Sequence, residues 1–576
     1  MSGTHVTMSA ASGDGQDGAP EQTTAAPAAP SPAGPPPAGA PDGPADAPAP
    51  AAARASALRQ PATLIIIGMT LLALAVRLYY FTRPGYLLGV TEYDDGSYFG
   101  SAVRLVHGVL PYRDFVFVQP PGITILMTPV ALLSKVTGTD AGLAVARILT
   151  MLAGAAGTAL AGLLVRHRGA LAALIATGIV AVYADSVASS HTLLVEPWVV
   201  LFCLIGAVAV FDGDTFTSSR RRLVWGGVAF GFAGLIEAWA IVPVLVLLVL
   251  MIRTGRRTLI WLAGVAAGFL LPVAPFAAIA PRNFFHGVIT AQIGGREGAI
   301  RVPLYFRIRH MAGFANYPDL KHTLVLAVAA ALAGFVVVAT LLASGLARKL
   351  PPVLDWFAYG TTAAIIAMFL WPSQFHYHFS GFLAPFFGLS LALPAARLVA
   401  VLRDRTARAP VAGRAIAALA GTVAAVVLAA GTVSQVSFEH TLLPLAPIDA
   451  MAIGKKIIPP GACVLADNVA YTITANRFVN SKPGCPTVDD GTGANFALSH
   501  GLAAETGAGR VPAVYTLWRE ALTHADYLWF TSLYNHRIAW NPALRTYVDT
   551  HFVRVRSDVA KFRLYVRKGF PGSNAG

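Results

Sequence analysis

Long apolar runs separated by short polar segments fill the middle of this chain. Most runs approach the length of about 20 residues that an α-helix needs to cross a membrane. The pattern predicts about eleven membrane-spanning helices in a transmembrane domain over residues 61–435. These helices are expected near residues 62–82, 142–165, 170–186, 193–211, 223–237, 238–252, 258–280, 323–346, 353–371, 379–400 and 412–433.

Basic residues collect between the apolar runs, as they do in cytoplasmic loops. With the N-terminus inside, the eleven spans place every such cluster on the cytoplasmic side of the plasma membrane. The clusters are residues 166–168, 220–222, 253–257, 348–349 and 397–414. We therefore expect the first external loop (83–140), the loop 281–322 and everything after the last span to lie outside.

The first external loop contains two short segments of helical character. Residues 97–107 place Tyr98 on an apolar face, which also fits an interfacial helix without chemistry of its own. The run 121–133 is too short for a confident span, and counting it as one would move the cluster 166–168 outside. We predict that both are juxtamembrane or re-entrant helices on the outer face.

The two ends of the chain have other compositions. Residues 1–60 are rich in Pro, Ala and Gly and predict a disordered cytoplasmic tail. Residues 436–576 predict an extracytoplasmic α/β domain, with strands at 462–466 and 527–531, an amphipathic helix at 511–524 and two alternating runs over 552–566. In this domain Asp467, Asp489 and Asp490 are interpreted as turn residues.

Composition sets the class of protein. The chain has 576 residues, of which 55% are hydrophobic and only 12% charged, and its mean hydropathy is +0.60. The net charge of +14 lies in the loop clusters, which fix topology, so we exclude a nucleic-acid partner. Cys463 and Cys485 have no metal-ligand spacing and are expected to form a disulfide outside the cell, whereas Cys203 lies in an apolar run.

The most concentrated polar chemistry is the acidic stretch after the first span. Glu92, Asp94 and Asp95 repel one another at a membrane boundary, so a metal, a bound cation or a transferred proton must compensate them. The alternative is that Asp94 and Asp95 only cap the helix that begins near Ser97.

Several motifs share an order along the chain with one family. They are Asp94-Asp95-Gly96-Ser97-Tyr98, Pro111-Tyr112-Arg113-Asp114, Gln119-Pro120-Pro121-Gly122, Glu196-Pro197, and His376-Tyr377-His378 ahead of Pro385. In this order and with this topology, the chain resembles the GT-C glycosyltransferases. Within them it is most similar to the branch of the protein O-mannosyltransferases and the lipid A aminoarabinose transferase.

The resemblance implies transfer of a sugar from a polyprenyl-phosphate donor to an acceptor hydroxyl on the outer face. The sugar would be mannose, arabinofuranose or a related one, and the acceptor a glycan, lipid or protein of the cell envelope. Asp94 is the expected general base, because a hydroxyl attacks well only when a base takes its proton. Asp95 and Glu196 are expected to orient it or to hold Mg²⁺, Mn²⁺ or Ca²⁺.

A positive charge beside the departing phosphate would lower the barrier. The candidates are a metal ion, Arg113 and the arginines of the outer loop, which are Arg282, Arg296, Arg301, Arg307 and Arg309. Those loop arginines have a second interpretation, contact with anionic membrane lipids. Further substrate contacts are expected at Glu92, Tyr98, Gln119, His376 and His378.

Two departures from the family pattern keep other functions open. The family often has Lys where this chain has Gln119, and a basic residue where it has Glu237. A catalytically inactive scaffold is therefore one alternative. The other is a transporter or flippase for a lipid-linked sugar, although its two halves would be expected to resemble each other, and they do not.

Overall fold

Helices make up most of the described residues between 60 and 442. The computed structural model describes residues 60–290, 301–372, 374–442, 448–555 and 563–570. The predicted tail and Arg296 lie outside the described residues. From Ala55 onward the chain forms one unit.

All eleven predicted spans are helical. They are α2 (Pro61–Thr82), α5 (Thr139–Val165), α6 (Ala170–Val182), α8 (Glu196–Val210), α9 (Arg220–Ile236), α10 (Ile241–Met251), α11 (Arg256–Ile279), α15 (His322–Ala347), α16 (Val353–Leu370), α17 (Ser380–Arg405) and α18 (Pro410–Thr441). Within the described part of the chain, seven helices are long and apolar enough to cross a membrane, and four apolar helices are shorter. The chain is a multi-pass membrane protein. Helix α18 continues past the predicted domain boundary at residue 435.

Shorter helices connect these spans. They are α3 (Asp94–Val106), α4 (Gly122–Thr137), α7 (Ala184–Ala188), α12 (Pro281–Phe285) and α14 (Leu304–Met311), with single turns η1 (Arg166–Arg168), η2 (Ala238–Ala240), η3 (Ile252–Thr254), η4 (His286–Thr290) and η5 (Tyr377–Phe379). A two-stranded hairpin joins β1 (Phe211–Asp212) to β2 (Thr215–Phe216). Helices α3 and α4 correspond to the two short helices that the sequence predicts in the first external loop.

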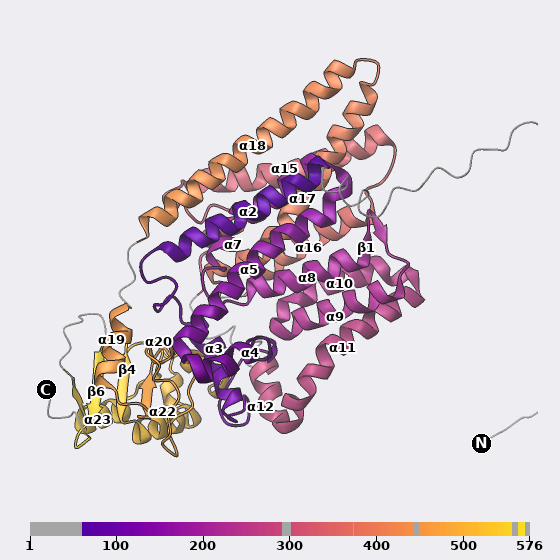
Figure 1. The fold of residues 1–576 in the computed structure, drawn as a ribbon. Helices are drawn as coiled ribbons and strands as arrows, with labels where there is room; N and C mark the ends of the chain where they lie inside the picture. The colour runs from indigo at the N-terminus through magenta and orange to yellow at the C-terminus, as the bar shows by residue number, and fades with distance from the viewer. Residues whose placement is uncertain (1–59, 291–300, 373, 443–447, 556–562, 571–576) are drawn as a thin grey trace, which may run out of the picture. The chain divides into compact units, whose positions relative to one another are not determined.

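Glycines allow close packing inside the helical part. A Cβ atom on Gly227 would lie 2.2 Å from the carbonyl oxygen of Trp261, and one on Gly268 would lie 2.3 Å from that of Val228. Helices α9 and α11 therefore pack backbone against backbone, as small residues permit in membranes. Helix α17 packs against α6, α15, α16 and α18 in the middle of the bundle (Figure 1).

The C-terminal part is the predicted α/β domain. Its sheet has the order β3-β4-β6-β5, formed by β3 (Val464–Ala466), β4 (Tyr527–Phe530), β5 (Phe552–Arg554) and β6 (Arg563–Arg567). Strands β3 and β4 are parallel and the other pairs antiparallel. The helices are α19 (Ile448–Ile457), α20 (Ala470–Thr474), α21 (Gly491–Leu498), α22 (Pro512–His524) and α23 (Pro542–His551), with the turn η6 (Ala508–Arg510).

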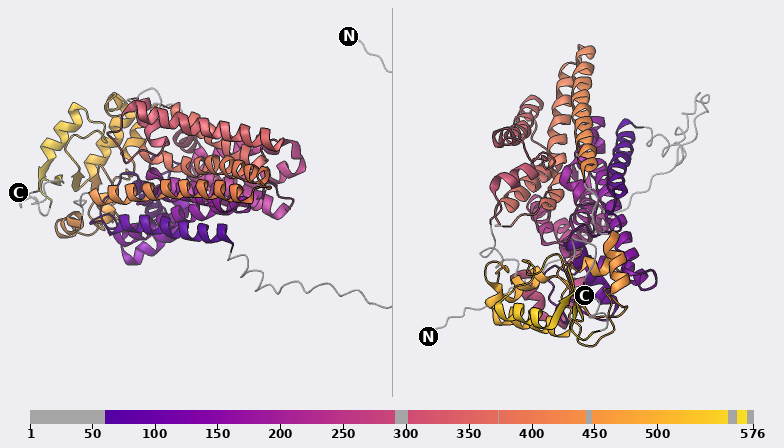
Figure 2. Two further views of the ribbon diagram at one scale, coloured as in Figure 1. Left: turned by 90° about the horizontal axis from the view of Figure 1, so that it is seen from above. Right: turned by 90° about the vertical axis from the view of Figure 1, so that its left-hand side faces the viewer.

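This domain lies at one end of the helical bundle in Figure 1 and Figure 2, and Figure 1 shows α3 and α4 at that end. Helix α20 contacts α3 and α5. The contact with α3 is close because Gly96 has no side chain: a Cβ atom there would lie 2.5 Å from the backbone nitrogen of Ala470. A disulfide joins Cys463 to Cys485, with their Cα atoms 5.5 Å apart.

Candidate functional site

Three helix starts bring Asp94, Glu196 and His378 together. Asp94 opens α3, Glu196 opens α8, and His378 lies in the turn η5 directly before α17. Nδ1 of His378 lies 2.7 Å from Oε1 of Glu196, and Nε2 lies 3.8 Å from Oδ2 of Asp94. An ionised carboxylate only accepts hydrogen bonds, so the imidazole donates to Glu196. His378 thus bridges two carboxylates.

The three side chains differ in their access to solvent. The exposed fraction is 38% for the Asp94 side chain, 7% for His378 and 0% for Glu196. The arrangement runs from a buried carboxylate through an imidazole to a carboxylate that a substrate can reach. This order is typical of a site in which a buried acid orients a histidine and the histidine supports the exposed group.

The surroundings of Asp94 favour its protonated form. Although part of the side chain meets solvent, protein atoms crowd the carboxyl group, and this burial raises the pKa of Asp94 to about 7. His378 opposes the shift, while the nearby carboxylates of Asp490, Glu92 and Glu196 add to it. A carboxylate with a pKa near neutral pH is well matched to taking up a proton.

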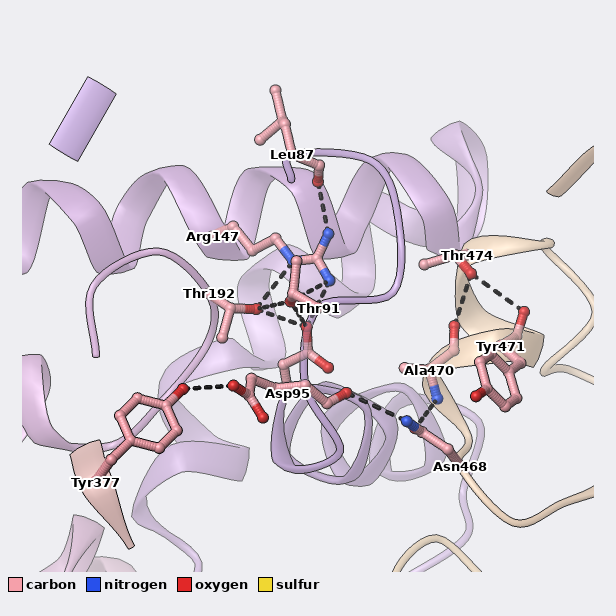
Figure 3. Close-up of polar contacts among 11 residues, drawn as sticks. Leu87, Thr91, Asp95, Arg147, Thr192, Tyr377, Asn468, Ala470, Tyr471 and Thr474 are labelled. Atoms are coloured by element: carbon pink, nitrogen blue, oxygen red, sulfur yellow. Dashed lines mark hydrogen bonds and ion pairs between the residues drawn. The ribbon is translucent and has the colours of Figure 1, made fainter. Parts of the chain in front are cut away.

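Asp95, one residue further, has a different environment. Its side chain is fully buried, and Oδ2 lies 2.5 Å from Nη2 of Arg147 (Figure 3). The hydroxyls of Thr192 and Thr91 donate to the same oxygen at 2.6 and 3.0 Å. Asp95 therefore neutralises an arginine inside the bundle.

The residues present do not form the predicted cation site. Asp95 is engaged by Arg147, and Glu196 accepts from His378. Within the described ranges, no group of three or more His, Cys, Asp or Glu side chains has an arrangement that could hold a metal ion.

Glu92 lies beside the same site. Its carboxylate accepts a hydrogen bond from the hydroxyl of Tyr377, and its carbonyl oxygen accepts one from Asn468 at 3.3 Å. Burial raises the pKa of Glu92, and the bond from Tyr377 opposes that shift. Glu92 thus links η5 and the C-terminal domain to the segment that carries Asp94.

The C-terminal domain contacts α3 through Asp489 and Asp490. The hydroxyl of Tyr93 donates to Oδ1 of Asp490 at 2.9 Å, and Ser97 donates to the carbonyl oxygen of Asp489 at 2.8 Å. Arg104 forms an ion pair with the Asp489 carboxylate at 3.2 Å. Asp490 also caps α21. These two residues therefore do more than shape a turn, because they hold the helix that begins with Asp94.

Comparison with solved structures identifies the architecture. ArnT from Cupriavidus metallidurans bound to undecaprenyl phosphate superposes with a TM-score of 0.54 and 16% identity, over 87% of this chain and 98% of that one. An Archaeoglobus fulgidus oligosaccharyltransferase tethered with an acceptor peptide superposes with a TM-score of 0.52 and 14% identity, over 89% of this chain and 75% of that one. The chain has the GT-C glycosyltransferase fold. No family model matches it, and no curated protein does.

On this GT-C fold, Arg113 and Gln119 lie in the predicted loop but make other contacts. Arg113 forms an ion pair with its neighbour Asp114 at 2.8 Å. It lines a cavity of about 470 Å³ together with residues of α12, η4 and the C-terminal domain. Gln119 is half-buried, and its carbonyl oxygen accepts from Tyr112 at 2.6 Å. Tyr98 is buried within α3.

The remaining predicted contacts lie in several separate segments. His376 stacks on His378 with ring centroids 5.6 Å apart, and burial lowers the pKa of His376 to about 4. Arg307 donates to the carbonyl oxygen of Phe369 at 2.8 Å, whereas Arg282 and Arg301 are exposed. Glu237 is buried and accepts from the backbone nitrogen of Ala238 at 3.0 Å.

Several residues of the site went unpredicted. Arg147 gave a usable signal, because a lone arginine in an apolar run must have a partner. Asp185 gave the same signal, and it pairs with His310 at 2.9 Å. Tyr377 and Asp490 gave none, since their partners Glu92 and Tyr93 are far away in the sequence.

Proposed function

We propose that this chain transfers a sugar from a polyprenyl-phosphate donor to an acceptor hydroxyl outside the cytoplasmic membrane, with Asp94 as the general base. The observation that carries the proposal is the Asp94–His378–Glu196 arrangement on a GT-C fold. The donor class is supported by two structural neighbours. One is described with undecaprenyl phosphate, and AglB from Archaeoglobus fulgidus (TM-score 0.51, 14% identity, over 88% of this chain and 74% of that one) with dolichol-phosphate.

The proposed reaction is a single displacement. The acceptor oxygen bonds to the anomeric carbon as the bond from that carbon to the phosphate oxygen breaks. Asp94 takes the hydroxyl proton, and polyprenyl phosphate leaves with the electron pair. His378, held by Glu196, faces Asp94 and stabilises its carboxylate before the transfer. Mannose, arabinofuranose and related sugars are the proposed cargo, and an envelope glycan, lipid or protein is the acceptor.

The test is transfer by the purified, reconstituted protein. Polyprenyl-phosphate sugars carrying a radiolabel are supplied with mixed cell-envelope acceptors, and the labelled product is counted. We expect Asp94→Asn to lose at least about a hundredfold in rate, the scale of a missing general base. The matched control is Asp140→Asn at the start of α5, a carboxylate paired with Lys455 on the surface, which should keep full activity.

Other results would change the function assigned. If wild type transfers no sugar but moves the labelled lipid across the bilayer, the chain is a flippase. If it does neither, the scaffold interpretation replaces the enzyme. Equal transfer rates for wild type and Asp94→Asn would support the glycosyltransferase activity and would show that Asp94 is not its general base.

A further inference from the structure

The Asp94 site is rich in negative charge, although the proposed donor is a phosphate. Glu92, Glu196 and Asp490 all act electrostatically on Asp94. A phosphate among carboxylates needs a positive group beside it, most of all when its leaving oxygen gains charge. His378 already lies between Glu196 and Asp94.

Arg147 and two of the arginines predicted for this role, Arg113 and Arg307, are engaged in other contacts. Arg147 is buried against Asp95, and Arg113 is paired with Asp114 in the first external loop. Arg307 donates to the carbonyl oxygens of Phe369 and Val302. A basic group from another part of the chain is therefore a candidate to face the donor.

Arg537 of the C-terminal domain lies beside the acidic segment. Its guanidinium carbon is 4.8 Å from the centroid of the Tyr93 ring, next to Asp94 in the chain. Its charge also acts on the Glu92 carboxylate. The side chain is 23% exposed, so a ligand can reach it. Nη1 of Arg537 also forms an ion pair with the buried Asp467 carboxylate at 3.6 Å and donates to Thr531 at 3.3 Å.

We propose that Arg537 binds the phosphate of the donor at the Asp94 site, so that the C-terminal domain supplies part of the active site. A guanidinium suits this role because its planar array of N–H donors matches two phosphate oxygens at once. The proposal rests on the proposed function, since it assumes a phosphate-bearing donor.

The backbone around Arg537 is fixed against the same elements. Asn495 of α21 donates to the carbonyl oxygen of Arg537 at 3.0 Å, and the amide nitrogen of Arg537 donates to Asn535 at 2.9 Å. Asp490, the N-cap of α21, accepts a hydrogen bond from the Tyr93 hydroxyl. Helix α21 and its N-cap thus hold both the Tyr93 ring and the backbone of Arg537, whose guanidinium lies over that ring.

The same domain contains a matched control. Arg545 lies over the ring of Tyr534 at the same 4.8 Å, and Asp549 accepts from the Tyr534 hydroxyl at 2.5 Å. This second set repeats the aspartate, tyrosine and arginine arrangement entirely within the C-terminal domain. Among the described residues its ring and hydroxyl contacts lie within that domain, whereas Arg537 and Asp490 contact Tyr93 in the segment that carries Asp94.

The experiment measures binding to the full-length protein in lipid nanodiscs. The probes are undecaprenyl phosphate, undecaprenol without phosphate, and inorganic phosphate. We expect Arg537→Gln to weaken undecaprenyl phosphate binding at least about tenfold, the scale of one lost charge-assisted contact. Arg537→Lys should fall in between, because it keeps a point charge and loses the fork. Arg545→Gln should bind like wild type, and undecaprenol should not distinguish the variants.

Each other outcome has a defined meaning. Wild-type affinity in Arg537→Gln, or an equal loss in Arg545→Gln, overturns the assignment of Arg537 while leaving the proposed function intact. If wild type binds undecaprenyl phosphate no better than undecaprenol, the donor proposal itself fails. Inorganic phosphate binding alone would reveal an anion site unrelated to the lipid. If Arg537→Gln does not fold, the Arg537→Lys variant tests the proposal instead. Wild-type affinity for undecaprenyl phosphate and wild-type salt dependence in Arg537→Lys would overturn the bidentate contact.

Discussion

At the scale of single residues, the two neighbouring aspartates of the acidic stretch have separate tasks. Successive side chains on an α-helix point about 100° apart, so Asp94 and Asp95 face different surroundings at the start of α3. Asp94 turns toward His378 and solvent, whereas Asp95 turns inward to Arg147. Neither is the helix cap, because Tyr93 holds that position without a capping side-chain bond.

The raised pKa of Asp94 predicts the pH dependence of transfer. A general base works in its deprotonated form, so activity should fall as the pH drops through about 7. An aspartate with an ordinary pKa of about 4 would stay ionised over that range. We expect the rate at limiting donor to decrease about tenfold per pH unit below 7. Lipid binding measured over the same range is the control, and a constant rate between pH 5 and 8 would contradict the assignment.

The buried pair of Asp95 and Arg147 predicts a loss of stability rather than of chemistry. Asp95→Asn leaves a buried guanidinium without its counter-charge, which costs about 3–5 kcal/mol. Thermal unfolding in detergent should show a much lower midpoint for Asp95→Asn than for Asp94→Asn. Replacing both residues, as in Asp95→Asn with Arg147→Met, should recover part of the loss. A normal midpoint combined with lost transfer would instead make Asp95 a catalytic residue.

At the scale of elements, the contact between α9 and α11 depends on glycines. A Cβ atom at Gly231 would lie 2.1 Å from the carbonyl oxygen of Val265, whereas one at Gly234 would have Phe269 at 3.8 Å. Backbone cannot move aside as a side chain can, so Gly231→Ala must separate the two helices.

These two glycines give a matched pair of variants. We expect Gly231→Ala to reduce the yield of monodisperse protein and to lower its unfolding midpoint. Gly234→Ala should match or slightly exceed wild type, because alanine is the better helix former and has room there. Equal behaviour of both variants would show that α9 and α11 do not pack as closely as described.

At the scale of the whole molecule, the C-terminal domain is joined to the helical part around one helix. Helix α3 begins with Asp94 and contacts Asp489, Asp490 and Ala470 of that domain. The domain's own core must therefore stay folded for α3 to keep its position. The disulfide between Cys463 and Cys485 constrains a loop of that core.

We expect removal of this disulfide to affect sugar transfer as well as the stability of the C-terminal domain. Closing a loop of this size stabilises a domain by about 3 kcal/mol in the chain-entropy model. The variant Cys463→Ser with Cys485→Ser should unfold its C-terminal domain at a lower temperature and lose activity as that domain melts. A reductant added to the Cys203→Ala variant, whose remaining cysteines are those of the disulfide, should cause the same loss of stability and activity. Full activity in a protein whose C-terminal domain has melted would show that α3 keeps its position without it.

The sequence by itself determined the helices and the general chemistry. Each span is recognisable as a local run of apolar residues, and strands such as β4 as short buried runs. The eleven spans, the short helices α3 and α4 and most of the sheet could therefore be predicted. Asp94, Glu196 and His378 could be predicted as candidates because carboxylates and histidines at a membrane boundary are costly without a function.

Only the tertiary structure decided which candidates meet. His378 joins Asp94 and Glu196 across 284 and 182 positions of the chain, and no local pattern encodes such a distance. The same holds for Arg147 with Asp95, and for Asp490 and Arg537 with Tyr93. Side-chain partners depend on how helices pack and on which face each residue takes. Local periodicity fixes the elements, and the packing of those elements fixes the site.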